Sequence, residues 1–225
     1  MSYANDAFVF VLGTAGDVGH CSKCGRRFSA TALSRHFHFS EVTTVSNQKV
    51  TKLKPNQKSA AALDTPTDLA PSAVKAVSAA LNGLLADSYA LYLKTKNFHW
   101  HVSGPHFRDY HLLFDDQAAG ILAATDDMAE RVRKIGGTTL RSIGHIAKLQ
   151  SIDDNDAEFV PPAMMLSELM KDNKAVVESM RKAHDVADEH DDVATASLIE
   201  NWIDETEKRV WFLFEAGRAA SNSGH

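Results

Sequence analysis

The stretch that decides the fold runs from residue 105 to residue 135, PHFRDYHLLFDDQAAGILAATDDMAERVRKI. Large apolar side chains recur in it every seven residues, and this spacing predicts one long helix of a helical bundle. Pro105 and the pair Gly136-Gly137 mark its start and its end. The predicted core stripe consists of Phe107, Phe114, Ile121, Met128 and Ile135, with His111, Ala118, Thr125 and Val132 between them.

Three more long helices are predicted, at about 71–100, at about 163–189, and from Asp191-Asp192 to Gly217. A short helical turn is expected at 140–149, within the longer connection between the second and third helices. This order describes an all-α, ferritin-like four-helix bundle over residues 67–219, followed by a disordered C-terminus at 220–225. The apolar sets that support the first and fourth helices are Val74, Val77, Leu81, Leu84, Leu85, Tyr92 and Leu93, and Ile199, Trp202, Ile203, Val210, Leu213 and Phe214.

Charge is divided unevenly along the chain. The 225 residues carry a formal charge of −5, but residues 1–60 carry +5 and therefore the remainder carries −10. The composition is globular, which excludes a collagenous or disordered chain, and the two cysteines cannot form a disulfide framework. No apolar run is long enough to cross a membrane, and the apolar stretch 7–12 lacks the preceding basic residue of a signal peptide. A cytoplasmic location is expected.

A basic tail is predicted at residues 42–66, where large apolar side chains are scarce and the chain is expected to stay flexible. No acid lies between Val42 and Leu63. Such a tail suits sequence-independent, salt-sensitive binding to the phosphates of DNA, although a merely solubilising tail has the same composition. The candidate DNA-binding residues are Lys49, Lys52, Lys54 and Lys58.

A strip of metal-ligating residue types lies on one side of the helix at 105–135. His111, Asp115, Asp126 and Glu130 fall within about 100° of one another around the helix axis, beside the core stripe. His99 comes twelve residues before His111, near the end of the preceding helix. Imidazole and carboxylate without thiolate suit iron, manganese or zinc. Solvated acids and histidines on an amphipathic helix would give the same pattern.

The strip is too long for one ion, because His111 and Asp126 are about 22 Å apart at 1.5 Å per residue. The positions 111 and 130 have the same midpoint as 115 and 126. A twofold axis near positions 120–121 would therefore place His111 opposite Glu130 of a second copy, and Asp115 opposite Asp126. The sequence thus predicts a dimer with two identical metal sites between its chains.

The same residues carry a resemblance to a known family. The segments NFHWHVSGPHF at 97–107, HLLFD at 111–115, DDMAER at 126–131 and Gly136-Gly137 closely resemble the Dps family, the DNA-protecting mini-ferritins of starved bacterial cells. The resemblance covers about residues 60–217. It implies a hollow dodecamer with ferroxidase sites between subunits, in which hydrogen peroxide oxidises Fe(II) and the ferric product is stored as a mineral. The implied iron ligands are His99, His111, Asp115, Asp126 and Glu130.

The resemblance also implies that Trp100, next to the site, supplies or quenches an electron during oxidation. The alternative for Trp100 is a core indole that packs the first helix. Ordinary ferritins hold iron inside one bundle with Glu-x-x-His pairs, and no glutamate here has a histidine three residues later.

Residues 1–41 form an extension of uncertain fold that is not typical of the family. Cys21, Cys24, His36 and His38 are similar to a zinc finger, but the spacing of the histidines departs from that pattern. Three interpretations of this extension stay open: zinc binding at Cys21 and Cys24, redox chemistry of the Cys-x-x-Cys pair, and a segment without metal. A translation start at Val42 or Val45 also stays open.

These observations give two functional hypotheses. The first is an iron-storing ferroxidase that uses peroxide, assembles into a homo-oligomer and binds DNA non-specifically in the nucleoid. The second is a structural nucleoid protein that compacts DNA without significant ferroxidase turnover.

Overall fold

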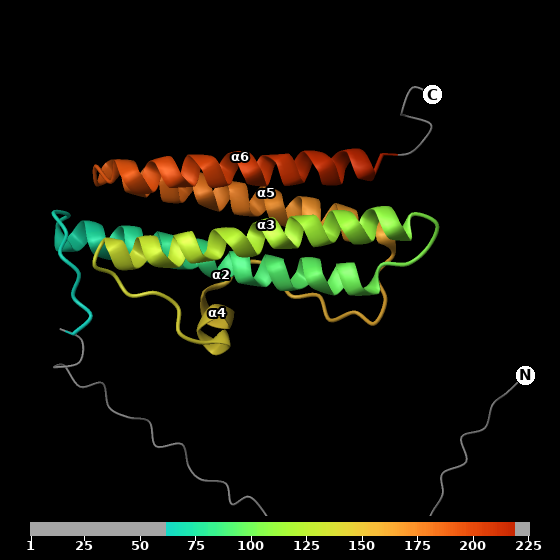
Figure 1. Ribbon diagram of the computed structural model, residues 1–225, viewed down its shortest axis with the longest axis horizontal. Helices are drawn as coiled ribbons and strands as arrows, with labels where there is room; N and C mark the ends of the chain where they lie inside the picture. The colour runs from blue at the N-terminus through green and yellow to red at the C-terminus, as the bar shows by residue number, and fades with distance from the viewer. Residues whose placement is uncertain (1–61, 219–225) are drawn as a thin grey trace, which may run out of the picture. The chain divides into compact units, whose positions relative to one another are not determined.

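The computed structural model describes residues 62–218, which form five helices and no strand (Figure 1). The bounds are α2 Pro71–His101, α3 Phe107–Lys134, α4 Ile143–Leu149, α5 Pro162–Glu189 and α6 Val193–Ala216. The predicted ferritin-like four-helix bundle is confirmed, including the short helix α4 between the second and third long helices. The predicted extension 1–41 with Cys21 and Cys24, the four tail lysines and the segment 220–225 lie outside the described residues.

The core lies between two helix pairs, α2 with α3 and α5 with α6, and α2 also packs along α5 (Figure 1). α4 lies outside the bundle next to α2. Within 62–218 no helix combines the length and the apolar character needed to cross a membrane. From Phe114 onward the heptad side chains are buried in the core, as predicted. The fully buried set includes Leu81, Leu84, Leu85, Phe98, Phe114, Met128, Ile135, Met165, Leu169 and Met180.

Three residues predicted for the core are exposed instead. Leu93 is 59% exposed and lines a groove between α2 and α4. Phe107, the first residue of α3, lies with its ring 5.0 Å from the ring of His111. Phe214 lines a hollow near the ends of α5 and α6. Helical spacing identified an apolar residue in each case, but each lies on a flank of its helix that the other helices of residues 62–218 leave about half exposed.

The connection from α4 to α5 is fixed by polar contacts with α2. The carboxylate of Asp87 accepts hydrogen bonds from the backbone N–H and hydroxyl of Ser151 and from the backbone N–H of Ile152. Because Asp87 is only 4% exposed, these bonds compensate a buried charge. They hold the start of the connection in place.

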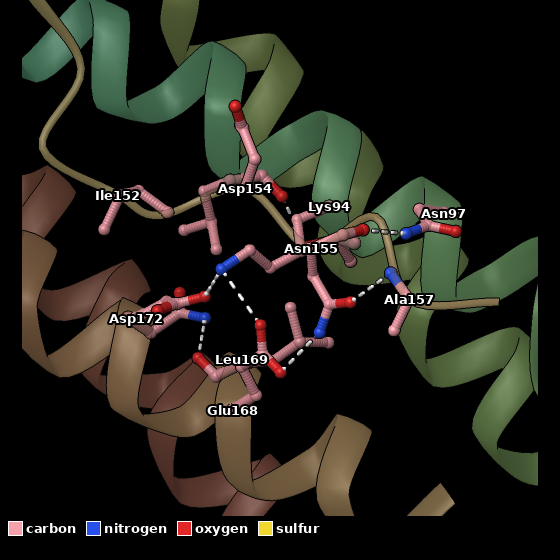
Figure 2. Close-up of polar contacts among 12 residues, drawn as sticks. Lys94, Asn97, Ile152, Asp154, Asn155, Ala157, Glu168, Leu169 and Asp172 are labelled. Carbon is pink, nitrogen blue, oxygen red and sulfur yellow. Dashed lines mark hydrogen bonds and ion pairs between the residues drawn. The ribbon is translucent and has the colours of Figure 1, made fainter. Parts of the chain in front are cut away.

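A cluster around Lys94 holds the next part of the connection (Figure 2). The Lys94 ammonium lies 2.8 Å from a carboxylate oxygen of Asp172 and 3.1 Å from one of Glu168. Asn155 donates to Glu168 at 2.9 Å, and Asn97 donates to the Asn155 carbonyl at 3.1 Å. Helices α2 and α5 and the connection between α4 and α5 are thus joined immediately before the turn of α2 that carries His99.

The segment before α2 is attached at the far end of α3. Arg133 donates hydrogen bonds to the backbone carbonyls of Leu63 and Gly137 and to the hydroxyl of Thr65. The backbone of Gly136 has φ +90°, a conformation that favours glycine, and a Cβ there would lie 3.2 Å from the Thr65 carbonyl oxygen. The predicted break after α3 therefore also provides the surface on which residues 63–65 lie.

Candidate metal centre

Two histidines from different helices form the centre of the site. His99 lies in the last turn of α2, and His111 lies in the second turn of α3, after the break at Gly104 with φ +103°. Their rings are stacked with centroids 3.8 Å apart. His99 Nδ1 lies 2.8 Å from the backbone oxygen of His111, and His111 Nδ1 lies 2.9 Å from the backbone oxygen of His99.

This exchange of hydrogen bonds determines the tautomer of both rings. A carbonyl oxygen only accepts, so each Nδ1 must carry the proton and donate it. In the neutral imidazole, Nε2 is then left with its lone pair, which is the form that binds a metal ion. Hydrogen bonding to the other ring nitrogen also fixes the orientation of a metal-binding histidine. The backbone therefore prepares two Nε2 atoms as ligands.

Asp115 lies beside this pair but is bonded to a lysine. His99 Nε2 is 3.9 Å from Asp115 Oδ1, and the same oxygen accepts a hydrogen bond from Lys96 Nζ at 2.7 Å. The hydrogen bond from Lys96, with its positive charge, is the main reason that the pKa of Asp115 is lowered from 3.8, with smaller contributions from His99 and His111. The carboxylate is ionised and exposed, and a metal ion must compete with an ammonium group for it.

The other two predicted ligands are not brought to this place. Asp126 and Glu130 lie three and four turns further along α3, exposed to solvent, and Glu130 is paired with Lys134 at 3.0 Å. In the part of one chain that the structure describes, no three histidine, cysteine or acidic side chains gather closely enough to hold a metal ion. The predicted ligands therefore lie in two separate groups, called the two half-sites below, one with His99, His111 and Asp115, the other with Asp126 and Glu130.

Trp100 does not pack in the core of its own bundle. It is 58% exposed, and the Lys96 ammonium lies 5.8 Å from the centre of its ring. The interpretation of Trp100 as a core indole is therefore wrong, whereas a role in electron transfer stays a prediction. Its exposed indole and Leu93 line the same groove beside α4.

Sequence reasoning missed Lys96 as a part of the site. A signal for it was present, because Lys96 precedes His99 by three residues and must share its side of α2. Its contact with Asp115, nineteen residues later, depends on how α2 and α3 pack, which periodicity does not give.

Replacement of Lys96 by methionine is expected to strengthen metal binding by roughly fivefold to tenfold, because an exposed ion pair worth about 1 kcal/mol no longer competes for Asp115. Calorimetric titration with Zn²⁺, which undergoes no redox reaction, measures the change. Lys208→Met is the matched control, because it removes a lysine from an exposed pair with Glu205 elsewhere. Equal affinities of Lys96→Met and the unmodified chain would show that Lys96 does not compete with the metal.

The fold and the two half-sites point to the ferritin-like class, and a family model described as Ferritin-like domain matches residues 78–216. Among curated relatives, the DNA protection during starvation protein of Brevibacillus brevis is 35% identical over 137 residues, which are 61% of this chain and 91% of the relative. The DNA protection during starvation protein 2 of Bacillus anthracis is 31% identical over 140 residues, which are 62% of this chain and 94% of the relative.

Solved structures agree with these relatives. The crystal structure of a Dps protein from Bacillus brevis has 33% identity and a TM-score of 0.64, covering 67% of this chain and all of that one. The chain therefore belongs to the Dps family of ferritin-like proteins, which confirms the resemblance seen in the sequence. Membership implies iron storage and DNA protection in general terms. The matched residues 78–216 do not include Cys21 or Cys24, and the comparisons do not support zinc there.

Proposed function

We propose that this protein is a ferroxidase of the Dps type, which oxidises Fe(II) with hydrogen peroxide and stores the Fe(III) in a hollow homo-oligomer. The observation that carries the proposal is the reciprocal bonding of His99 and His111, which leaves two Nε2 atoms free beside the ionised Asp115. Within residues 62–218 of one chain this set of nitrogen and oxygen ligands is incomplete, and it suits Fe(II) once further carboxylates are added.

A second copy supplies those carboxylates. With a twofold axis near the middle of α3, Asp126 and Glu130 of the second copy reach the histidine half-site, so that two identical sites form in each dimer. The strip near the axis is exposed in the single chain and consists of small or apolar side chains, which favours close approach of two helices. The residues are Ala119, Leu122 and Ala123.

In the proposed reaction, one molecule of hydrogen peroxide oxidises two Fe(II) ions. Two Fe(II) ions give one electron each, the O–O bond of hydrogen peroxide breaks, and with two protons two water molecules form. Carboxylate oxygens are hard ligands that favour Fe(III) over Fe(II). The Fe(III) then leaves for the cavity of the assembly, for which we propose twelve subunits.

Native mass spectrometry with and without Fe(II) tests the assembly and the metal content together. We expect a dodecamer that binds iron at two sites per dimer. In a stopped-flow measurement, Fe(II) should be oxidised faster by hydrogen peroxide than by oxygen. A monomer at micromolar concentration would contradict the proposal, because the site needs two chains.

The tail at 42–66 gives the assembly its proposed contact with DNA and its place in the nucleoid. Lys49, Lys52, Lys54 and Lys58 carry four positive charges, and many copies on one particle raise the effective concentration of binding groups. Weak contacts of single tails with phosphates then add up.

Deletion of residues 42–60 is expected to abolish retention of duplex DNA in a gel-shift assay at low salt, while iron oxidation is unchanged. The reason is the loss of the phosphate contacts that release counterions. A variant with the four lysines replaced by glutamine keeps the length of the tail and serves as the charge-specific control. Full DNA retention in both variants would exclude the tail as the DNA-binding element.

The second hypothesis, a structural nucleoid protein without turnover, predicts DNA compaction together with iron oxidation no faster than in buffer. The prepared His99 and His111 argue against it, because DNA compaction alone requires no metal-binding tautomers.

A further inference from the structure

A crevice runs between α3 and α6, the two neighbouring helices of the bundle that contact each other least. Its outer part is a cavity of about 520 Å³, and its inner part is a smaller cavity of about 80 Å³ within the bundle. Gly120, Glu205 and Arg209 line both parts, so the two cavities meet at these residues. The total volume is in the range of small-molecule sites.

Gly120 keeps the crevice open on the α3 side. Glycine inside a helix makes the helix less stable than alanine would. Such a glycine is often explained by a neighbouring group that occupies the space where a side chain would be. Here a Cβ on Gly120 would meet no atom within 4 Å. Gly120 lies nine residues from His111, about half a turn round the helix at 100° per residue, and is therefore not part of the metal-binding strip.

Arg209 brings a positive charge into the crevice without a carboxylate partner. Its Nε donates to Asn173 Oδ1 at 3.0 Å, and its Nη2 donates to Thr206 Oγ1 at 2.6 Å. In the described part of the chain no carboxylate oxygen lies within 4.0 Å of the guanidinium, which makes no other hydrogen bond there. Burial lowers the pKa of Arg209 to about 10, and the charge of Glu205 opposes this only in part.

Gln117 is a second incomplete polar group of the same crevice. The residue is 6% exposed, and its Nε2 donates to the backbone oxygen of Arg209 at 3.2 Å. Its Oε1 is buried and accepts no hydrogen bond from residues 62–218. Buried polar atoms in folded proteins are almost always paired. The crevice thus offers unused donors on Arg209 and an unused acceptor on Gln117.

We infer that the crevice between α3 and α6 binds a small organic acid, with its carboxylate on Arg209 and its apolar body against Leu112, Leu113 and Phe212. The planar guanidinium matches a carboxylate with two parallel hydrogen bonds. A hydroxyl or N–H group of the acid, or a water molecule beside it, donates the missing hydrogen bond to Gln117 Oε1. Asp109, Asp116 and Glu205 also line the outer cavity and do not attract anions. The remaining cation there, Lys208, is exposed and lies 3.9 Å from Glu205, so recognition depends on the buried guanidinium.

Binding of 4-fluorobenzoate to the assembled full-length protein, followed by fluorine NMR, tests the inference. The uncharged 4-fluorobenzamide has nearly the same shape and serves as the matched probe. We expect the acid to bind at least tenfold more tightly than the amide, because only the acid makes charge-assisted bonds to Arg209. Equal binding of the two probes, or no binding of the acid at millimolar concentration, would overturn the inference.

Two variants locate the site. Gly120→Leu fills the crevice where the structure leaves room and is expected to weaken binding of the acid at least tenfold. Arg209→Met is expected to bind acid and amide equally, and Gly120→Leu carries the test alone if Arg209→Met does not fold. Arg181→Met, which removes an arginine from an exposed pair with Glu207, is the control and should bind as the unmodified chain does. Unchanged binding in Gly120→Leu would place the acid elsewhere and contradict the inference.

Discussion

Chains with both His111→Ala and Asp115→Ala are expected to oxidise Fe(II) with hydrogen peroxide at least about 100-fold more slowly than the unmodified chain, since even the loss of groups behind the ligands costs 10-fold to 100-fold. The changes remove one prepared Nε2 and the carboxylate beside it, so that His99 remains alone. Stopped-flow absorbance of Fe(III), corrected for oxidation in buffer, measures the rate.

The same variant tests whether the site is shared between chains. Asp126→Ala with Glu130→Ala should be equally inactive, because it removes the other half-site. When the two inactive chains are unfolded, mixed in equal amounts and refolded together, half of the dimers contain one of each. Each mixed dimer has one complete site, so activity should return to about a quarter of the normal value. A site within one chain would give no recovery.

The matched control for these variants is His106→Ala with Asp116→Ala. It also removes one histidine and one aspartate at the start of α3, but neither residue belongs to the metal-binding strip. Its rate should equal that of the unmodified chain. Unchanged oxidation in His111→Ala with Asp115→Ala would exclude these residues as iron ligands, whatever the control shows.

Lys94→Met is expected to destabilise the folded protein by about 3 kcal/mol, because the change leaves the partly buried carboxylates of Asp172 and Glu168 without their cation. Within residues 62–218, Glu168 then keeps only the hydrogen bond from Asn155. Lys94 is only 6% exposed. For a domain of this size the loss corresponds to roughly 6–12 °C in the apparent Tm. Thermal unfolding followed by circular dichroism at pH 7 measures it.

Two comparisons separate the ion pair from other effects. Lys171→Met removes an exposed lysine next to Asp172 and should change the stability by less than about 0.5 kcal/mol. Lys94→Met combined with Asp172→Leu should recover part of the loss, because one unpaired charge is then removed. A loss of equal size in Lys94→Met and Lys171→Met would contradict the assigned role of Lys94.

The contribution of Lys94 to the stability of the fold is expected to fall at alkaline pH. Burial lowers the pKa of Lys94, but the hydrogen bonds and charges of Asp172 and Glu168 outweigh it, and the pKa is raised above 10.5. Burial raises the pKa of Asp172 from 3.8, so the pair also needs a pH high enough to ionise that carboxyl. Above that range the stabilisation linked to Lys94 is fully present up to pH 10.5 and is lost as the pH rises through the raised pKa of Lys94. The difference between the unmodified chain and Lys94→Met should shrink in that alkaline range.

Much of the fold follows from local pattern. The heptad from Phe114 to Ile135 is buried as predicted, because a stripe that wide must face the other helices. Leu93 and Phe107 were assigned wrongly, since helical spacing cannot distinguish the flank that faces the bundle from one beside it.

For the candidate site, the sequence indicated three residues that lie together but not how they are hydrogen-bonded. His99, His111 and Asp115 were identified by type and spacing, and the structure brings them together. The exchange of bonds between each imidazole and the other residue's carbonyl requires the packing of α2 against α3, as does the ammonium of Lys96 on Asp115. A single sequence contains neither, because both are contacts between helices.

The attachment by Arg133 sets a limit on how far the segment before residue 63 can reach from the bundle. Arg133 holds Leu63 and Thr65 at the end of α3, one turn from Glu130. The residues from 42 to 62 span at most about 70 Å when fully extended. If the lysines of this segment hold a duplex and the protein consumes peroxide, as proposed, the bound DNA is tethered within about that distance of Leu63. The peroxide is then consumed close to where it would cause strand breaks.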